Sequence, residues 1–375
     1  MDIIDDFLTV CRGTARAPPI ITKQKNGLFK LRAQVHIIMT MPPGAGKTSG
    51  MMDDMRNVVP GGDMSGPGLL GTINGKSGDF VPGACTLAAG KVLWLDEYQR
   101  MHSKVREKLL SLIETSHTER SLGFNLTDSI HRKTKYGYVQ GKKGTGHIEI
   151  CSRFSCMLTG TIKPQVRQEN YMMQGAGGEK AWMDAIMFLQ RFVHVNMALD
   201  EADFYKVISG ERMFNVKDYS QYYIEPIIMD DYLDIVKWHQ ELTSGEDFRF
   251  LDVLPMSAKA FKTRNCLDVV RMEAMRRSQI ATLGKSGLPS WENTKKHIAY
   301  ALFNVLANSL TFSEYTVFMN MISDEPKTQE QVARTIGISQ QAVSKIEKKL
   351  IEYKLLDSNK NVEEYNLTTE DPPLE

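Results

Sequence analysis

The sequence predicts an α/β fold built around a parallel sheet, and three short apolar runs carry this prediction. They cover residues 35–39, 91–95 and 154–161, and each ends in a turn or in polar residues. Apolar runs of this length, bounded by turn signals, are typical of strands that are buried on both faces of a sheet. Helical patterns lie between them, as the connections between parallel strands require.

The first run leads into a Pro/Gly turn that ends in Gly46-Lys47-Thr48, where a helix can begin. This is the pattern of a phosphate-binding loop. Its backbone N–H groups would cradle the β-phosphate, Lys47 would reach the β- and γ-phosphate oxygens, and the Thr48 hydroxyl would hold Mg²⁺. Met41 stands where the usual pattern begins with glycine, but the end of the loop that does chemistry is intact. The predicted nucleotide-binding residues are Pro43, Gly44, Ala45, Gly46, Lys47, Thr48 and Ser49.

The second run ends in Asp96-Glu97, 49 residues after Lys47. A buried strand would deliver Asp96 to the Mg²⁺ shell, and Glu97 would orient or deprotonate the attacking water. Acidic residues at strand ends also occur as helix caps, and Gly-Lys-Thr can occur by chance in a surface turn. The two motifs together disfavour both alternatives, so ATP and Mg²⁺ are the expected cofactors.

Two glycine-turn patterns predict hairpins that carry lysines. Asn74-Gly75 joins two short apolar stretches and places Lys76 at a hairpin tip. Residues 129–146 contain five Lys/Arg and no acidic residue, and they predict a second hairpin tipped by Lys142 and Lys143. Such tips are candidates for contact with nucleic-acid phosphates, and an ordinary solvated loop is the alternative.

The last 65 residues predict a helix-turn-helix followed by a small β wing. Apolar residues and Gly337 fall where two packed helices joined by a tight turn need them. The helix from Ser339 would be the recognition helix, with Lys345 on its exposed, locally basic face. Residues 311–375 carry 7 Lys/Arg against 12 Asp/Glu, so contact with DNA and contact with a protein both stay open.

The chain of 375 residues is long enough for two to three domains. We expect a helix and basic linker over 1–34, an α/β nucleotide-binding core over 35–222, a helical lid over 223–310 and the winged helix over 311–375. The first segment would clasp a neighbouring subunit, touch a phosphate backbone or remain a solvated linker.

Bulk composition excludes several classes of protein. The net charge is +1, so any nucleic-acid surface must be local. The five cysteines lack a CxxC pair, which favours a reducing compartment and argues against a zinc ribbon. The N-terminus lacks the basic start of a signal peptide, and no apolar stretch reaches the roughly 18 residues of a membrane span. We therefore expect a cytoplasmic, nucleoid-associated protein without membrane contact.

The order of these motifs resembles the AAA+ core of the minichromosome maintenance (MCM) replicative helicases. Residues 83–101, GACTLAAGKVLWLDEYQRM, are similar to the family's GALxLADGG-hhhhDEFDKM. FLQRFVHVNMALDEADF resembles LLSRFDLIFVLxDxPD, which implies that Arg191 is an arginine finger for the γ-phosphate in the adjacent subunit. Arg264 and Arg271 are spaced as in the family's RxLExLIR helix, which implies that Arg264 is a sensor-2 residue. The C-terminal winged helix is also a family feature.

The sequence departs from the family at Met41, in a longer hairpin tipped by Lys142 and Lys143, and in two further features. It shows no counterpart of the large N-terminal domain, and the sensor-1 Asn has no clear match. Anchoring on Arg153 gives Thr161 and anchoring on Pro164 gives Lys163. We expect Thr161, because a hydroxyl at a strand end is short enough to orient water.

The resemblance implies an ATP-driven DNA translocase or helicase that self-associates into a ring, with a hexamer as the expected form. An ATP-switched replication initiator, loader or regulatory module is the alternative, with its winged helix on an origin or on a replication protein. A chelatase-related protein remodeller is a third interpretation, which the winged helix disfavours.

Overall fold

The computed structural model describes most of the chain, with gaps. The described residues are 2–24, 27–42, 58–60, 64–74, 77–161, 177–197, 214–217, 227–245, 255–321 and 327–352, and the single positions 164, 205, 209, 219, 248 and 251. The predicted nucleotide loop over 43–49, Lys76, Lys163 and the predicted wing lie outside them.

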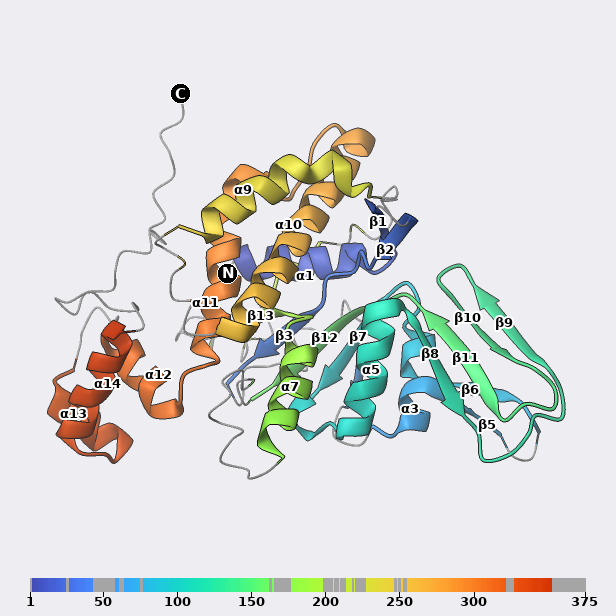
Figure 1. Cartoon of the computed structure of the whole chain (residues 1–375), viewed down its shortest axis with the longest axis horizontal. Helices are drawn as coiled ribbons and strands as arrows, with labels where there is room; N and C mark the ends of the chain where they lie inside the picture. The colour runs from blue at the N-terminus through green and yellow to red at the C-terminus, as the bar shows by residue number, and fades with distance from the viewer. Residues whose placement is uncertain are drawn as a thin grey trace.

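A sheet of five parallel strands forms the centre of the molecule (Figure 1). Its strands, in spatial order, are β13 (Val193–Asn196), β3 (Ile37–Thr40), β12 (Ser155–Gly160), β7 (Val92–Asp96) and β4 (Val58–Pro60). All three predicted strands are therefore confirmed, and the α/β class with them. β3 and β12 are buried along their whole length, which is why both faces of these strands are apolar.

The chain order of the strands creates a switch point at β3. From β3 the chain goes to the outer strand β4, returns inward through β7 and β12, and only then crosses to β13 on the other side of β3. Ligands of open α/β sheets bind outside the carboxyl ends of the strands at such a point. The predicted phosphate-binding loop follows β3 directly.

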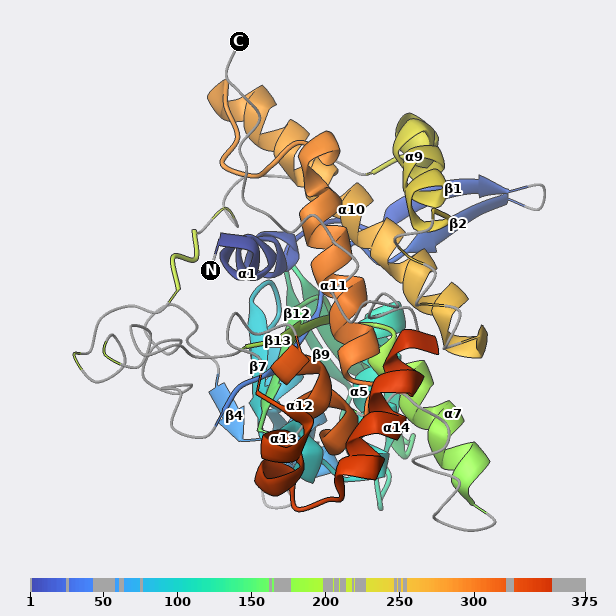
Figure 2. The same cartoon turned by 90° about the vertical axis from the view of Figure 1, so that its left-hand side faces the viewer.

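Helices cover this sheet. α1 (Asp2–Thr14) packs against β3 and β12, and its Leu8, Val10 and Cys11 are completely buried. α5 (Ser103–Thr115) and α7 (Gly178–Leu189) lie side by side in front of the sheet in Figure 1. The segment after α1 forms a hairpin of β1 (Ile20–Gln24) and β2 (Gly27–Leu31), which projects beside α9 (Leu233–Thr243) in Figure 2.

Both predicted hairpins are present. β5 (Gly71–Ile73) pairs with β6 (Phe80–Pro82) between the short helices α3 (Gly66–Leu70) and α4 (Ala84–Leu87). β10 (Gly137–Gly141) pairs with β11 (His147–Ser152), and their turn carries Lys142 and Lys143. Two unpredicted strands, β8 (His117–Ser121) and β9 (Ile130–Thr134), extend this hairpin to a four-stranded Greek key in the order β8-β11-β10-β9.

The region predicted to be helical contains α9 (Leu233–Thr243), α10 (Pro255–Leu283) and α11 (Lys295–Ala307), with the 3-10 turns η2 (Met229–Tyr232) and η4 (Trp291–Thr294). A further 3-10 turn, η1 (Tyr98–Arg100), follows β7. A buried polar contact ties α11 to the sheet: Asn304 Nδ2 donates to the His194 carbonyl at 3.1 Å, and Asn308 Nδ2 lies 2.8 Å from His194 Nδ1. Burial lowers the pKa of His194 to about 4, so its ring stays neutral near pH 7.

The C-terminal part confirms the predicted helix-turn-helix. α12 (Phe312–Met321), α13 (Gln329–Ile336) and α14 (Gln340–Glu352) pack on one another, at the opposite end of the molecule from the four-stranded sheet in Figure 1. Of the helices described, none is both long enough and apolar enough to cross a bilayer.

Candidate functional site

The predicted acidic pair lies at the carboxyl edge of the sheet. Asp96 is the last residue of β7, and Glu97 follows in the left-handed conformation, with φ 52°. A residue with a Cβ adopts this conformation only where its surroundings compensate the strain, and such residues concentrate at functional sites. Here the backbone N–H of Glu97 donates to Asp96 Oδ1 at 2.9 Å.

A hydrogen-bond chain that the sequence did not predict orients Asp96. Trp94 Nε1 donates to Thr159 Oγ1 at 2.8 Å, and Thr159 Oγ1 donates to Asp96 Oδ1 at 2.6 Å. Trp94 and Thr159 are both completely buried, so water does not compete for these bonds. The one sequence signal for this hydrogen-bond chain was the polar Thr159 inside the apolar strand 155–160.

Thr161 lies near the acidic pair, as its predicted role requires. Gln99 Nε2 donates to Glu97 Oε2 and lies 3.5 Å from Thr161 Oγ1. The structure therefore gathers Asp96, Glu97 and Thr161 at the ends of β7 and β12. It adds Gln99, to which the sequence analysis gave no role.

Several buried polar atoms at this edge have no hydrogen-bond partner among the described residues. They are Thr40 Oγ1 at the end of β3, both side-chain amide atoms of Asn196 at the end of β13, and Gln99 Oε1. Buried polar groups need partners, so this edge fits the polar loop 43–49 and a polar ligand. An Asp96 carboxylate and a Thr48 hydroxyl are hard oxygen ligands that suit Mg²⁺ held together with phosphate. Among the described residues, no group of three or more His, Cys, Asp or Glu side chains is placed so that it could hold a metal ion.

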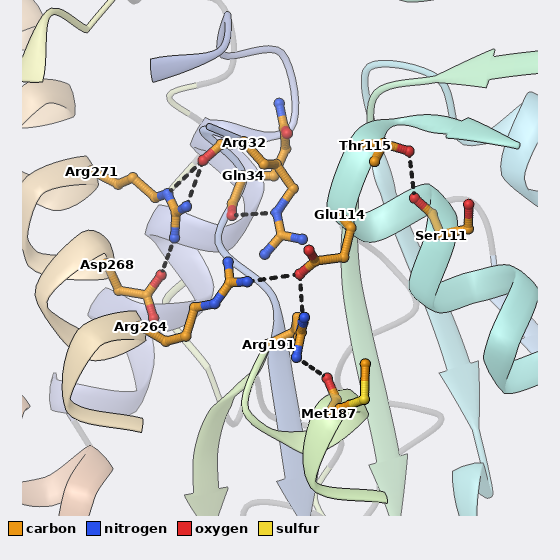
Figure 3. Close-up of polar contacts among 10 residues, drawn as sticks. All are labelled: Arg32, Gln34, Ser111, Glu114, Thr115, Met187, Arg191, Arg264, Asp268 and Arg271. Atoms are coloured by element: carbon orange, nitrogen blue, oxygen red, sulfur yellow. Dashed lines mark hydrogen bonds and ion pairs between the residues drawn. The ribbon is translucent and has the colours of Figure 1, made fainter. Parts of the chain in front are cut away.

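A second charged group, the arginine cluster, lies at the amino edge of the sheet (Figure 3). Arg32 precedes β3, Arg191 precedes β13, and Arg264 and Arg271 come from α10. Two carboxylates accompany them, Glu114 at the end of α5 and Asp268 on α10.

Glu114 joins the two arginines that the resemblance singled out. Arg191 Nε and Arg264 Nη2 both donate to Glu114 Oε1, the second at 2.8 Å. The side chains of Arg191, Arg264 and Glu114 are 10%, 25% and 28% exposed, so the group is accessible from one side. Arg271 instead bonds Asp268 at 2.5 Å and the carbonyl of Arg32, and it is buried.

The arginine cluster has more positive than negative charge. Four guanidinium groups face two carboxylates, and the buried Arg32 keeps one nitrogen, Nη1, without a hydrogen-bond partner in the described part of the chain. Burial, with the charges of Arg271 and Arg264, lowers the pKa of Arg32. Burial alone would raise the pKa of Glu114, but the hydrogen bond from Arg191 and the charges of Arg264, Arg191 and Arg32 outweigh it and lower that pKa.

The two charged groups are too far apart to act on one phosphate. Trp94, Met157, Ile37 and Val193 lie level across the strands. Asp96 lies two residues beyond that level and Arg191 two residues before it. Strand geometry then separates their backbones by roughly 20 Å, from about 13 Å along the strands and about 14 Å across them.

Three of the predicted DNA-binding lysines, Lys142, Lys143 and Lys345, lie within the described residues and outside both groups. Lys142 and Lys143 are exposed on the β10–β11 turn, where Lys143 Nζ is 4.0 Å from Asp128 Oδ1. Lys345 is exposed on α14.

Neither the known protein-family models nor the curated protein sequences contain a match to this chain.

Replacing Thr159 by Val tests the hydrogen-bond chain behind Asp96. The change leaves the buried Trp94 Nε1–H without its acceptor, so we expect the free energy of unfolding to fall by about 1–3 kcal/mol. In a Trp94→Phe background this donor is absent, and Thr159→Val should cost about 1 kcal/mol less. Denaturant unfolding of the parent, the two single variants and the double variant measures the difference. An equal cost of Thr159→Val in both backgrounds would contradict the hydrogen bond between Trp94 and Thr159.

Acid unfolding tests the charge on Glu114. Its pKa is lower in the folded chain than the ordinary value of 4.5, so ionised Glu114 stabilises the fold above that pH. The contribution is lost as pH falls through the lowered pKa. Below about pH 4.5 the stability of the parent should therefore fall more steeply than that of Glu114→Gln, as thermal unfolding against pH would measure. Glu107→Gln, exposed on the same helix, should keep the parent's slope, and an identical slope in Glu114→Gln would show that Arg191 and Arg264 do not hold this carboxylate.

Proposed function

We propose that this chain is an MCM-like AAA+ ATPase that couples ATP hydrolysis to movement on DNA, with each nucleotide site completed by a second copy. One observation carries the proposal. The acidic pair lies at the carboxyl edge of the sheet and the arginine cluster at its amino edge, roughly 20 Å apart.

That separation gives the arginines a role between subunits. A phosphate next to Asp96 is out of reach of Arg191 and Arg264 of the same chain. In a head-to-tail ring, the amino edge of one copy can face the carboxyl edge of the next, and such a heterologous interface closes into a ring when its rotation permits. A hexamer is the form we propose. Arg191 and Arg264, whose side chains are 10% and 25% exposed, then approach the neighbour's γ-phosphate together.

Each residue then has a distinct task. The loop 43–49 binds the triphosphate through Lys47, and Thr48 and Asp96 hold Mg²⁺, which neutralises charge on the phosphates when bound. Glu97 orients and deprotonates the attacking water, while Thr161 and Gln99 fix that carboxylate and the water. The neighbour's arginines stabilise the charge that develops on the phosphoryl oxygens.

DNA contact is assigned to the exposed lysines. Lys142 and Lys143 occupy a turn of a sheet inserted between α5 and β12, so a change around Glu97 and Thr161 can move that turn. Contacts to phosphates predict weak sequence preference and strong salt dependence.

A nucleotide-switched initiator or loader is the second candidate. The position of Glu114 favours this second function, because Glu114 accepts hydrogen bonds from both Arg191 and Arg264 within a single copy. Hydrolysis would then wait until an assembly withdraws these arginines from Glu114, and the bound state itself would be the signal to DNA or to a replication protein at the winged helix.

Mixing two inactive variants tests the shared site. Lys47→Ala removes the loop lysine and Arg191→Ala removes the finger, and each should lower ATP turnover by about 10³-fold or more. In an equal mixture, about a quarter of the interfaces combine an intact loop with an intact finger, so up to about a quarter of the parent rate should return. Phosphate release per subunit measures it.

The matched control is a mixture of Lys47→Ala with Glu97→Gln. Both changes affect the same edge of the same copy, so no mixed interface is complete and no activity should return. Arg191 would act within its own chain if the first mixture also stayed inactive while both variants still formed rings.

A further inference from the structure

The helix-turn-helix at the C-terminal end is tightly specified. Thr328 and Gln331 form a reciprocal capping box at the start of α13. Gly337 ends α13 with φ 77°, in the left-handed region that favours glycine. Two residues later Ser339 caps the next helix, its Oγ accepting from Ala342 N at 3.2 Å. The three-residue turn between α13 and α14 thus fixes their crossing.

Three acidic residues of this unit, Glu314, Glu330 and Glu347, are engaged within it. Glu347 on α14 is buried and accepts from Gln329 Nε2, and Glu314 on α12 bonds Lys349 Nζ at 2.5 Å. On α13, Glu330 pairs with Arg334 at 2.6 Å. Residues 327–352 carry five Lys/Arg and three Asp/Glu, so the acidic balance of 311–375 arises outside them.

The outward face of α14 is polar and carries two lysines, with the exposed Glu352 at its C-terminal end. Val343 and Leu350 are buried on its inner face, whereas Gln340, Gln341, Lys345 and Lys348 are exposed. Gln341, Lys345 and Lys348 follow the i, i+4, i+7 spacing of one helix face. An α-helix is about 10–12 Å across with its side chains, so a major groove about 12 Å wide admits it.

We propose that α14 reads duplex DNA in the major groove, with Gln340 and Gln341 on base edges and Lys345 and Lys348 on phosphates. In this class of module the first turn of the second helix contacts the bases. A glutamine amide pairs with N6 and N7 of adenine through two hydrogen bonds, so the preferred site contains A·T pairs at the positions that these residues reach. Movement along DNA needs backbone contacts alone. This second site would therefore bring the ATPase to a chosen duplex sequence.

The test is a selection from a randomised duplex pool with the full chain carrying Lys47→Ala, without nucleotide. This protein keeps α14 and removes ATP binding, so the outcome does not depend on the proposed ATPase. We expect an enriched motif with A·T pairs, bound at least about 10-fold more tightly than a scrambled duplex.

Two paired variants separate base contacts from phosphate contacts. Gln340→Ala/Gln341→Ala should lose the preference for the enriched duplex and keep the affinity for the scrambled one. Lys345→Ala/Lys348→Ala should weaken both, and should reduce the slope of log affinity against log salt by about two. Lys237→Ala/Gln240→Ala, exposed on α9, is the matched control and should behave as the parent.

Circular dichroism checks that each variant keeps its helices, which exposed side chains should not disturb. A pool without enrichment would overturn the proposal, and so would an enriched motif bound equally well after Gln340→Ala/Gln341→Ala. Duplex binding that none of the variants changes would also overturn it, because the DNA contact would then lie outside the α14 face.

Discussion

The direction of the parallel sheet is the constraint on which the rest of this molecule depends. Because all five strands run the same way, their carboxyl ends meet at one edge and their amino ends at the other. The acidic pair is fixed to the first edge by β7, and the arginine cluster to the second by the residues before β3 and β13. In the proposed ATPase, one chain presents two halves of a reaction site on opposite sides, and a second copy joins them.

Burial determines the strength of the polar interactions in both the acidic pair and the arginine cluster. Asp96 is held by Thr159 and Trp94 inside the sheet, where a hydrogen bond is strong because water is excluded. Arg32 is buried, and no carboxylate among the described residues forms an ion pair with it, which is costly unless an anion approaches. Glu114 supplies part of that negative charge in the single copy. A phosphate group would supply it at an assembled interface.

Local sequence patterns predicted the elements that local physics decides. The strands β3, β7 and β12 are buried on both faces, so their sequences are apolar runs. The helices α13 and α14 were predicted from their apolar spacing and from the glycine turn between them. β9 was missed because four of its five residues are exposed, so it has no apolar run. The meeting of Arg32, Glu114 and Arg264 could not be predicted, because more than 200 residues separate its first and last members and only the fold brings them together. The same holds for Thr159, whose role depends on β12 lying beside β7.

Dependence of ATP turnover on protein concentration tests the shared site most directly. Turnover per subunit would be measured over a range of concentrations, with and without single-stranded DNA, beside Glu97→Gln as the inactive reference. The account predicts a rate per subunit that rises with concentration as copies assemble, and rises again with DNA. A rate per subunit that is substantial and independent of concentration, from a protein that stays a monomer, would contradict it.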